Sequence, residues 1–140
     1  MSLYLRMIRW HAAIYERTNG WLGHRLFGVP AILLRTKGRK SGIERTCALV
    51  YARDGDDLLV VASNHGGERP PAWLLNLEAD PEVSVQLGRR RIAAKARPVY
   101  PDDAGYERLM KICNDNNKDR YTAYRTRTDR PIPVVVLAPV

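Results

Sequence analysis

Two apolar, strand-like runs flank a basic turn in the stretch VPAILLRTKGRKSGIERTCALVYAR, residues 29–53. The first run extends from Val29 to Arg35 and the second from Arg45 to Arg53, and both are rich in apolar and β-branched residues. Pro30, near the start of the first run, is tolerated at the edge of a sheet. The pattern predicts two β-strands joined by a short turn.

Four more strand-like runs follow, separated by turn residues. Asp54-Gly55-Asp56 predicts a hairpin turn, and Glu82 to Leu87 alternates apolar and polar residues. The other strands are expected at 57–63, 90–99 and 132–138, and helices at about 2–17, 72–78 and 101–114. Six strands joined mostly by hairpins, with flanking helices, predict an α+β, mainly β, fold built on an antiparallel, barrel-like sheet. We expect one domain over residues 1–140.

The formal net charge of +8 over 140 residues suits a nucleic acid, an anionic membrane surface or an anionic small molecule as partner. No helix-turn-helix, zinc finger or RNA-binding aromatic pattern accompanies the charge, so we do not expect nucleic-acid binding. The predicted first helix carries Leu3, Met7, Trp10 and Ile14 on one face. Such a helix either packs on the protein or lies on a membrane surface.

Cys47 and Cys113 fit no metal-binding or redox spacing, so we expect free thiols in a reducing cytoplasm. No apolar run reaches the ~20 residues that a membrane-spanning helix needs, and no signal-peptide pattern opens the sequence. We therefore expect a cytoplasmic protein, with peripheral membrane contact through the first helix as an option. The sequence leaves a monomer and a homodimer equally open.

The turn between the first two strands combines two glycines, Gly38 and Gly42, with four cations at 37, 39, 40 and 45. Glycines allow backbone conformations that bring amide N–H groups close to a ligand, and the cations supply charge-assisted hydrogen bonds to phosphate or carboxylate oxygens. A basic turn that is merely solvated is the common alternative. The Walker and dinucleotide-binding glycine patterns are both absent.

The sequence contains no convincing acid–base team. The histidines at 11, 24 and 65 are scattered, and paired carboxylates fall in turns and at a helix start. The binding apparatus is richer. The loop from Ser63 to Gly67 offers backbone amides, Trp73 either stacks on a ring or belongs to the core, and Tyr121 and Tyr124 share a face if their segment is helical. A cofactor with a flat ring and an acidic tail would then carry the reaction.

Four motifs in this order resemble the deazaflavin-dependent nitroreductase family of coenzyme F420-dependent oxidoreductases. They are TKGRKSGIER at 36–45, VVASNHGG at 60–67, PPAWLLNLEADP at 70–81 and YRTRTDRPIPVVVLAP at 124–139. The resemblance implies a split β-barrel related to flavin-binding reductases. It also implies hydride transfer from reduced F420 to a quinone or nitroaromatic acceptor, in a family found in actinobacteria.

The same resemblance implies the site residues. The cofactor tail would bind the turn, and the ring would lie between the second strand, the loop after residue 60 and the helix at 72–78. The cofactor-binding set is Arg39, Lys40, Ser41, Arg45, Thr46, Cys47, Ala48, Leu49, Val50, Val61, Ala62, Ser63, Asn64, Ala72, Trp73, Leu74, Leu75, Asn76 and Tyr121. Ser63, Tyr121 and Tyr124 would be the catalytic hydrogen-bonding groups, and no metal is expected.

The chain departs from the family pattern at Thr46-Cys47-Ala48, at Asn64-His65 and at Lys118, where a further tyrosine is expected. The last change falls on the substrate side. Two alternatives to the F420 reading are an FMN-dependent split-barrel reductase or oxidase, and a non-catalytic module that binds an anionic cofactor or nucleic acid. FMN has one phosphate and no glutamyl tail, so four cations in the turn exceed its needs.

Overall fold

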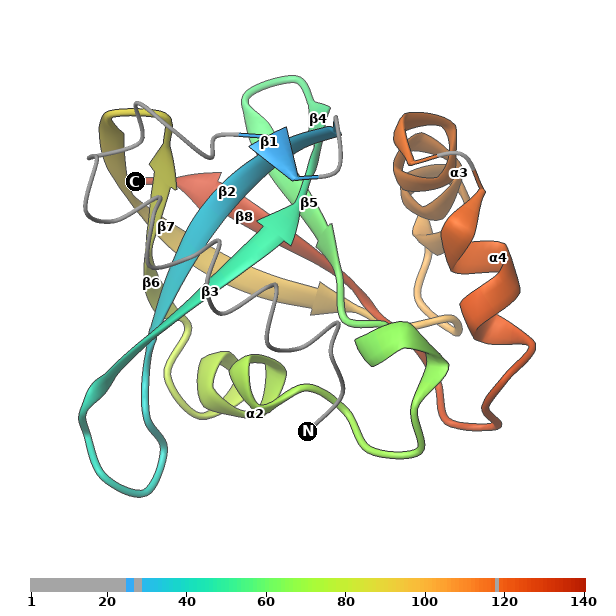
Figure 1. Cartoon of the computed structure of the whole chain (residues 1–140), viewed down its shortest axis with the longest axis horizontal. Coiled ribbons are helices and arrows are strands. Elements are labelled where there is room, and N and C mark those ends of the chain that lie inside the picture. The colour runs from blue at the N-terminus through green and yellow to red at the C-terminus, as the bar shows by residue number, and fades with distance from the viewer. Residues whose placement is uncertain (1–24, 27–28, 118) are drawn as a thin grey trace.

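The computed structural model describes residues 25–26, 29–117 and 119–140 (Figure 1). Eight strands form one antiparallel sheet, and short helices lie against both of its faces. The elements, in chain order, are β1 (Arg25–Leu26), β2 (Val29–Lys37), β3 (Glu44–Val50), β4 (Ala52–Asp54), β5 (Asp57–Val61), the 3₁₀ helix η1 (Asn64–Gly66), α2 (Ala72–Ala79), β6 (Glu82–Leu87), β7 (Arg90–Val99), α3 (Tyr106–Asn116), α4 (Arg120–Arg125) and β8 (Val134–Pro139).

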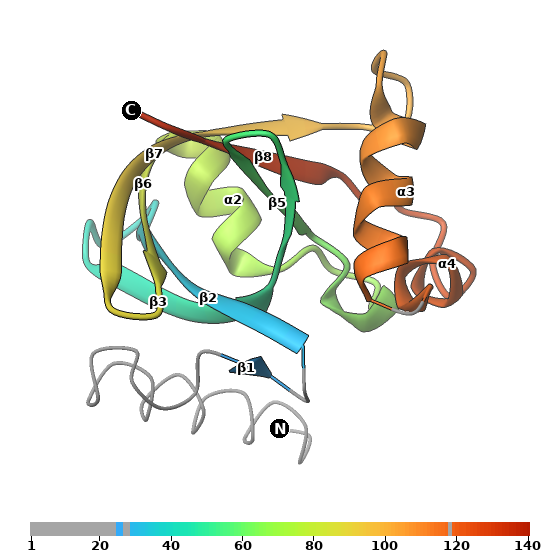
Figure 2. The ribbon, with the colours of Figure 1, turned by 90° about the horizontal axis from the view of Figure 1, so that it is seen from above.

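The strands follow the order β1-β2-β6-β7-β8-β5-β4, and β3 pairs with β2. The sheet curls on itself into a split barrel, with α2 on its concave side and α3 beside β5 and β8 on its convex side (Figure 2). This architecture confirms the predicted mainly β, antiparallel, barrel-like fold. β8, the last strand of the chain, lies between β5 and β7 in the middle of the sheet.

Strand alternation divides the buried side chains into two hydrophobic cores, because successive residues of a strand point to opposite faces. Val60 and Val135 belong to the core inside the barrel, which Trp73, Leu74 and Leu77 of α2 complete. Val61 and Val136 belong to the second core, between the sheet and the helices α3 and α4. β5 and β8 are therefore buried on both faces.

The structure corrects several predicted boundaries in the first half of the chain. The run 45–53 is not one strand: it is divided into β3 and β4 at Tyr51, and with the two-residue β1 this raises the number of strands from six to eight. β5 ends at Val61 rather than at residue 63, because the chain turns into η1. α2 matches its prediction to within one residue, ending before Asp80-Pro81.

Two corrections concern the second half. α3 begins at Tyr106 rather than near Pro101, after turns that end at Gly105 with a left-handed φ of 85°. β8 begins at Val134, after Pro133, which has no N–H to donate. The tyrosine-bearing segment is helical, as α4. The helix predicted at 2–17 and Lys118 lie outside the described residues.

Candidate functional site

The cationic turn between β2 and β3 closes through its own hydrogen bonds. The N–H of Gly38 donates to the carbonyl of Ile43 and the N–H of Gly42 to the carbonyl of Gly38, both at 2.8 Å. Ser41 Oγ accepts from the N–H of Ile43 at 3.1 Å. A Cβ at position 38 would lie only 2.8 Å from Ser41 Oγ, and Gly42 has a φ of 72°. The glycines are therefore needed to form this turn.

All four cations of this turn are exposed, and no ion pair of Arg39, Lys40 or Arg45 exists in the described part of the chain. Lys37 lies 3.7 Å from Asp80 of the helix α2. The neighbouring carboxylate, Glu44, faces Arg35 at 3.7 Å. The turn thus presents three charge-bearing side chains to solvent, an arrangement suited to an anion with several negative groups.

Asn76 of α2 attaches the turn to the body of the protein. Its side chain is buried, and its Oδ1 accepts from the backbone N–H of Arg39 at 3.2 Å and from Arg39 Nη1 at 3.0 Å. Its Nδ2 donates to Thr36 Oγ1 at 3.3 Å. The predicted role of Asn76 was direct cofactor contact, but the amide is engaged in holding Arg39 in place.

The predicted loop from Ser63 to Gly67 follows β5 and contains η1. Ser63 has α-helical torsions (φ −81°, ψ −32°), and the next residue, Asn64, has a left-handed φ of 43°. Successive residues of these two kinds turn their N–H groups to one side and form a small anion-binding concavity. The Ser63 side chain is 8% exposed, so only its edge is available to a ligand.

Arg130 supports this loop from behind, and the pattern of the sequence did not single it out. Its guanidinium donates to the carbonyls of Ala62, Ser63 and Gly67 at 3.2, 2.6 and 2.9 Å. The signal available in the sequence was its place in the fourth family motif. The partners could not be found that way, because they are backbone atoms more than sixty residues away.

The two predicted catalytic tyrosines lie on α4, next to the same loop. Tyr121 is buried at 7% exposure and Tyr124 is half-buried, with their ring centroids 6.2 Å apart in an edge-to-face arrangement. α4 packs on η1 so closely that a Cβ on Gly66 would lie 2.6 Å from the carbonyl oxygen of Tyr124. The fold thus brings the Ser63 loop and the tyrosines together.

The remaining predicted residues do not share one surface. In β3, Cys47 and Leu49 pack towards the interior of the barrel, whereas Thr46, Ala48 and Val50 alternate to the other face. The prediction that all five line the ring through their side chains is therefore wrong.

The other strand and helix positions divide in a similar way. Val61 faces α3 and α4, and Ala62 faces the barrel. Trp73 and Leu74 are buried in the core, so Trp73 is not open to stack on a ring; Leu75 is half-buried and Ala72 is exposed. These side chains can shape the site only from behind.

The thiols offer no reactive nucleophile. Burial raises the pKa of both Cys47 and Cys113 to about 12, so each remains protonated at neutral pH. No group of three potential metal ligands occurs among the described residues. The chemistry of this chain therefore depends on bound reactants and on hydrogen-bonding groups.

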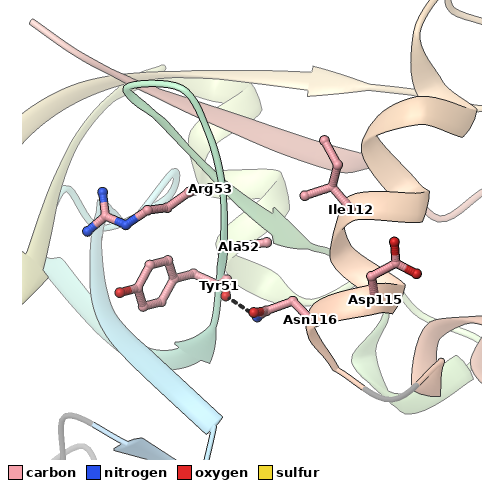
Figure 3. A pocket seen from close by; sticks show the side chains of 6 residues that line it. All are labelled: Tyr51, Ala52, Arg53, Ile112, Asp115 and Asn116. Carbon is pink, nitrogen blue, oxygen red and sulfur yellow. Dashed lines mark hydrogen bonds between the residues drawn. The ribbon is translucent and has the colours of Figure 1, made fainter.

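A shallow hollow of about 520 Å³ lies elsewhere, between β4 and α3 (Figure 3). Figure 3 shows Ile112, Asp115 and Asn116 on the α3 side of it. Asn116 Nδ2 donates to the Tyr51 carbonyl at 2.6 Å and ties the two walls together. None of the predicted site residues lines this hollow.

The family model for F420H(2)-dependent quinone reductases matches residues 7–139 of the sequence. The chain belongs to this family. A curated F420H(2)-dependent quinone reductase of Mycobacterium tuberculosis (strain ATCC 25618 / H37Rv) is 51% identical over 134 residues, which cover 95% of this chain and 90% of the relative. The family assignment confirms an oxidoreductase whose cofactor is reduced coenzyme F420.

Two solved structures support the same assignment of this quinone reductase family member. A structure titled F420-H2 dependent reductase (FDR-A) superposes with a TM-score of 0.69 at 33% identity, covering 77% of this chain and 93% of that one. A second, titled a domain-swapped dimer, gives a TM-score of 0.71 at 31% identity over 92% and 97% of the two chains.

The residues present fit the cofactor. Three exposed cations on a rigid turn match the phosphate and carboxylates of the F420 tail, and the backbone concavity at Ser63 and Asn64 offers neutral donors to a polar edge. The absence of an acid–base team in the described part agrees with a reaction in which the cofactor supplies the redox chemistry.

Proposed function

We propose that this chain reduces a quinone with F420H2, binding the cofactor tail in the β2–β3 turn and the quinone beside the loop that follows β5. The observation that supports this proposal is the turn itself, which holds Arg39 on Asn76 of α2 and leaves Arg39, Lys40 and Arg45 open to an anion. When bound, reduced F420 supplies a hydride from C5 of its ring. The quinone gains that hydride and one proton and becomes a hydroquinone.

The protein's contribution is binding, alignment and proton supply. Fixing ring and acceptor in contact turns a two-body encounter into one within a complex, which is the largest rate effect available without an acid–base team. Ser63 and Tyr121 carry hydroxyl groups at the loop and α4, and we assign them to hydrogen bonding with the quinone oxygens and to proton delivery. Tyr124 packs edge-on against Tyr121 and keeps it oriented.

Direct titration of the purified protein with F420 and with FMN tests the cofactor half of the proposal. Replacing both Arg39 and Lys40 by Ala should weaken F420 binding about 100-fold, because each charge-assisted hydrogen bond contributes about 1.5–3 kcal/mol. The matched control is Arg89→Ala with Arg90→Ala, which removes the same charge from the exposed β6–β7 hairpin. Equal losses in both variants, or tight binding of FMN without F420, would contradict the proposal.

Steady-state assays with F420H2 against menaquinone analogues and nitroaromatics test the acceptor half. We expect turnover with the quinones and slower reduction of the nitroaromatics. An enzyme that reduced only nitroaromatics would show that the acceptor is assigned wrongly, while leaving the cofactor assignment intact.

We also propose that the protein works in the cytoplasm at the surface of the membrane, where lipophilic quinones reside. None of the helices that the structure describes has the length and apolar character of a membrane-spanning helix. The outward face of β7 carries Arg91, Lys95 and Arg97 at alternate positions, all exposed and without an ion pair in the described residues. A flat row of three cations suits contact with anionic phospholipid head groups.

A further inference from the structure

Arg130 connects the segment before β8 to the loop after β5. Nε donates to the carbonyl of Gly67 at 2.9 Å, Nη1 to that of Ala62 at 3.2 Å and Nη2 to that of Ser63 at 2.6 Å. All three guanidinium nitrogens are thus used on one loop. A planar, charged fork is the side chain best suited to several fixed carbonyl oxygens.

These bonds determine which way the loop presents its amides. In a trans peptide the N–H points opposite to the carbonyl, and the described chain contains no cis peptide. Because the carbonyls of Ala62 and Ser63 face Arg130, the N–H groups of Ser63 and Asn64 face away from it. Neither N–H donates to another group within the described residues.

The opposite side of the loop is fixed by α4. Gly66, with a φ of 73°, packs against the backbone of Tyr124 without room for a side chain. The loop therefore lies between a charged fork and a helix. Burial lowers the pKa of Arg130 from 12.5, but a guanidinium remains protonated at any physiological pH.

We propose that Arg130 is a positioning residue: it orients the Ala62–Gly67 loop so that the N–H groups of Ser63 and Asn64 face the bound F420H2 and its acceptor. This inference rests on the proposed function, since it assigns the loop to that site. Arg130 touches neither reactant. It acts through the backbone it holds, and it adds positive charge behind donors that must face electron-rich oxygens.

The experiment compares Arg130→Gln, Arg130→Lys and the control Arg125→Gln by hydrogen exchange and by steady-state kinetics. Arg125 is also a cation of this region, but it is exposed and pairs with Glu107 at 3.5 Å. In Arg130→Gln, amide exchange across residues 62–67 should accelerate at least tenfold, since a single amide cannot replace three charge-assisted bonds. Exchange in β5 and β8 should stay unchanged.

Kinetics supply the functional readout. We expect Arg130→Gln to raise KM for F420H2 or the quinone about tenfold or more with a smaller change in kcat, and Arg130→Lys to recover part of the loss. Arg130→Lys also keeps the test open if the Gln variant does not fold. Unchanged exchange at 62–67, or faster exchange in every strand together with a proportional loss of activity, would overturn the inference.

The two proposals fail in different ways. Wild-type protein that does not bind F420 would remove the proposed function, while exchange at 62–67 would still report whether Arg130 holds the loop. Selective loosening of the loop with unaltered KM and kcat would show that the loop is not part of the site, and would overturn the positioning role.

Discussion

Asn76 orders a charged turn with a neutral side chain. Its carboxamide accepts two hydrogen bonds from Arg39 and donates one to Thr36, all from a buried position on α2. The guanidinium is therefore largely immobilised before any ligand binds, which reduces the entropy lost on binding. Carboxylate would be the stronger partner for Arg39, but it would cancel the charge that the site needs.

The buried thiol of Cys113 makes stability depend on pH in the alkaline range. Its pKa is about 12 in the folded protein and 9.0 in the exposed state, because burial disfavours the thiolate. The folded state thus holds the proton more tightly, so this contribution is complete below pH 9 and is lost as the pH rises towards 12. We expect the free energy of unfolding to fall by up to ~1.4 kcal/mol per pH unit from this thiol above pH 9.

Urea unfolding of wild type and Cys113→Val between pH 8 and pH 11 measures this slope, with the pH window set by the two pKa values. Valine keeps a similar volume and does not titrate, so the stability difference between the two proteins should shift in favour of the variant as the pH rises. A difference that stays constant over the whole range would contradict the assignment.

Among the elements, the contact between η1 and α4 depends most on a single position. Gly66 combines a φ of 73° with a 2.6 Å approach of any added Cβ to the carbonyl of Tyr124. Gly66→Ala should destabilise the protein by about 2–4 kcal/mol, since it adds backbone strain to a backbone clash. Thermal unfolding measures the loss.

Gly55→Ala is the matched control for this prediction. Gly55 also has a positive φ, 62°, but nothing lies within 4 Å of an added Cβ. It should cost only the strain of the left-handed conformation, about 1 kcal/mol. Equal losses for the two variants would mean that the packing of α4 on η1 contributes little.

Much of the fold could be predicted from the local pattern. Alternation in residues 82–87, the Asp-Gly-Asp turn and the Asp80-Pro81 stop depend on a few neighbouring residues, and β6, the β4–β5 hairpin and α2 appear where they were expected. The division at Tyr51 could not be predicted. It arises where the chain leaves β2 to pair with β5 instead, and pairing partners are not encoded locally.

The site was predictable only in part. The turn and the tyrosines were found from residue types, because charge, glycine and aromatic rings are visible in the sequence. The support given by Asn76 and Arg130 was not, since it depends on partners 37 to 68 residues away. The face on which each β3 side chain lies also requires the register with β2, which assigns Cys47 and Leu49 to the interior.

For the molecule as a whole, the positive charge is divided between two places with different surroundings. The β2–β3 turn adjoins α2, whereas the row on β7 lies on the convex side, beyond the area that α3 covers. Glu82 opposes Lys95 in register without forming an ion pair, and Ala138 lies on the other side of Lys95. The row on β7 is thus free to contact a flat anionic surface.

Vesicle sedimentation tests this contact. Arg91→Gln, Lys95→Gln and Arg97→Gln together should weaken binding to phosphatidylglycerol-containing vesicles about 100-fold at low salt, because each basic residue near such a surface contributes about 1 kcal/mol. Pure phosphatidylcholine vesicles should bind neither protein. Added salt should reduce wild-type binding steeply.

The control is Arg53→Gln, Arg108→Gln and Lys111→Gln, which changes the net charge equally from exposed positions on β4 and α3. It should keep most of the vesicle affinity. Wild-type affinity in the β7 variant would show that this strand does not carry the contact.

The position of β8 has a consequence for how the protein is made. β8 ends one residue before the end of the sequence, yet it supplies side chains to both hydrophobic cores and pairs with β5 and β7. While the last thirty or so residues are still inside the ribosomal exit tunnel, the emerging polypeptide can complete neither core. Folding to the native state must therefore wait for release from the ribosome, and until then the nascent chain exposes apolar strands that chaperones recognise.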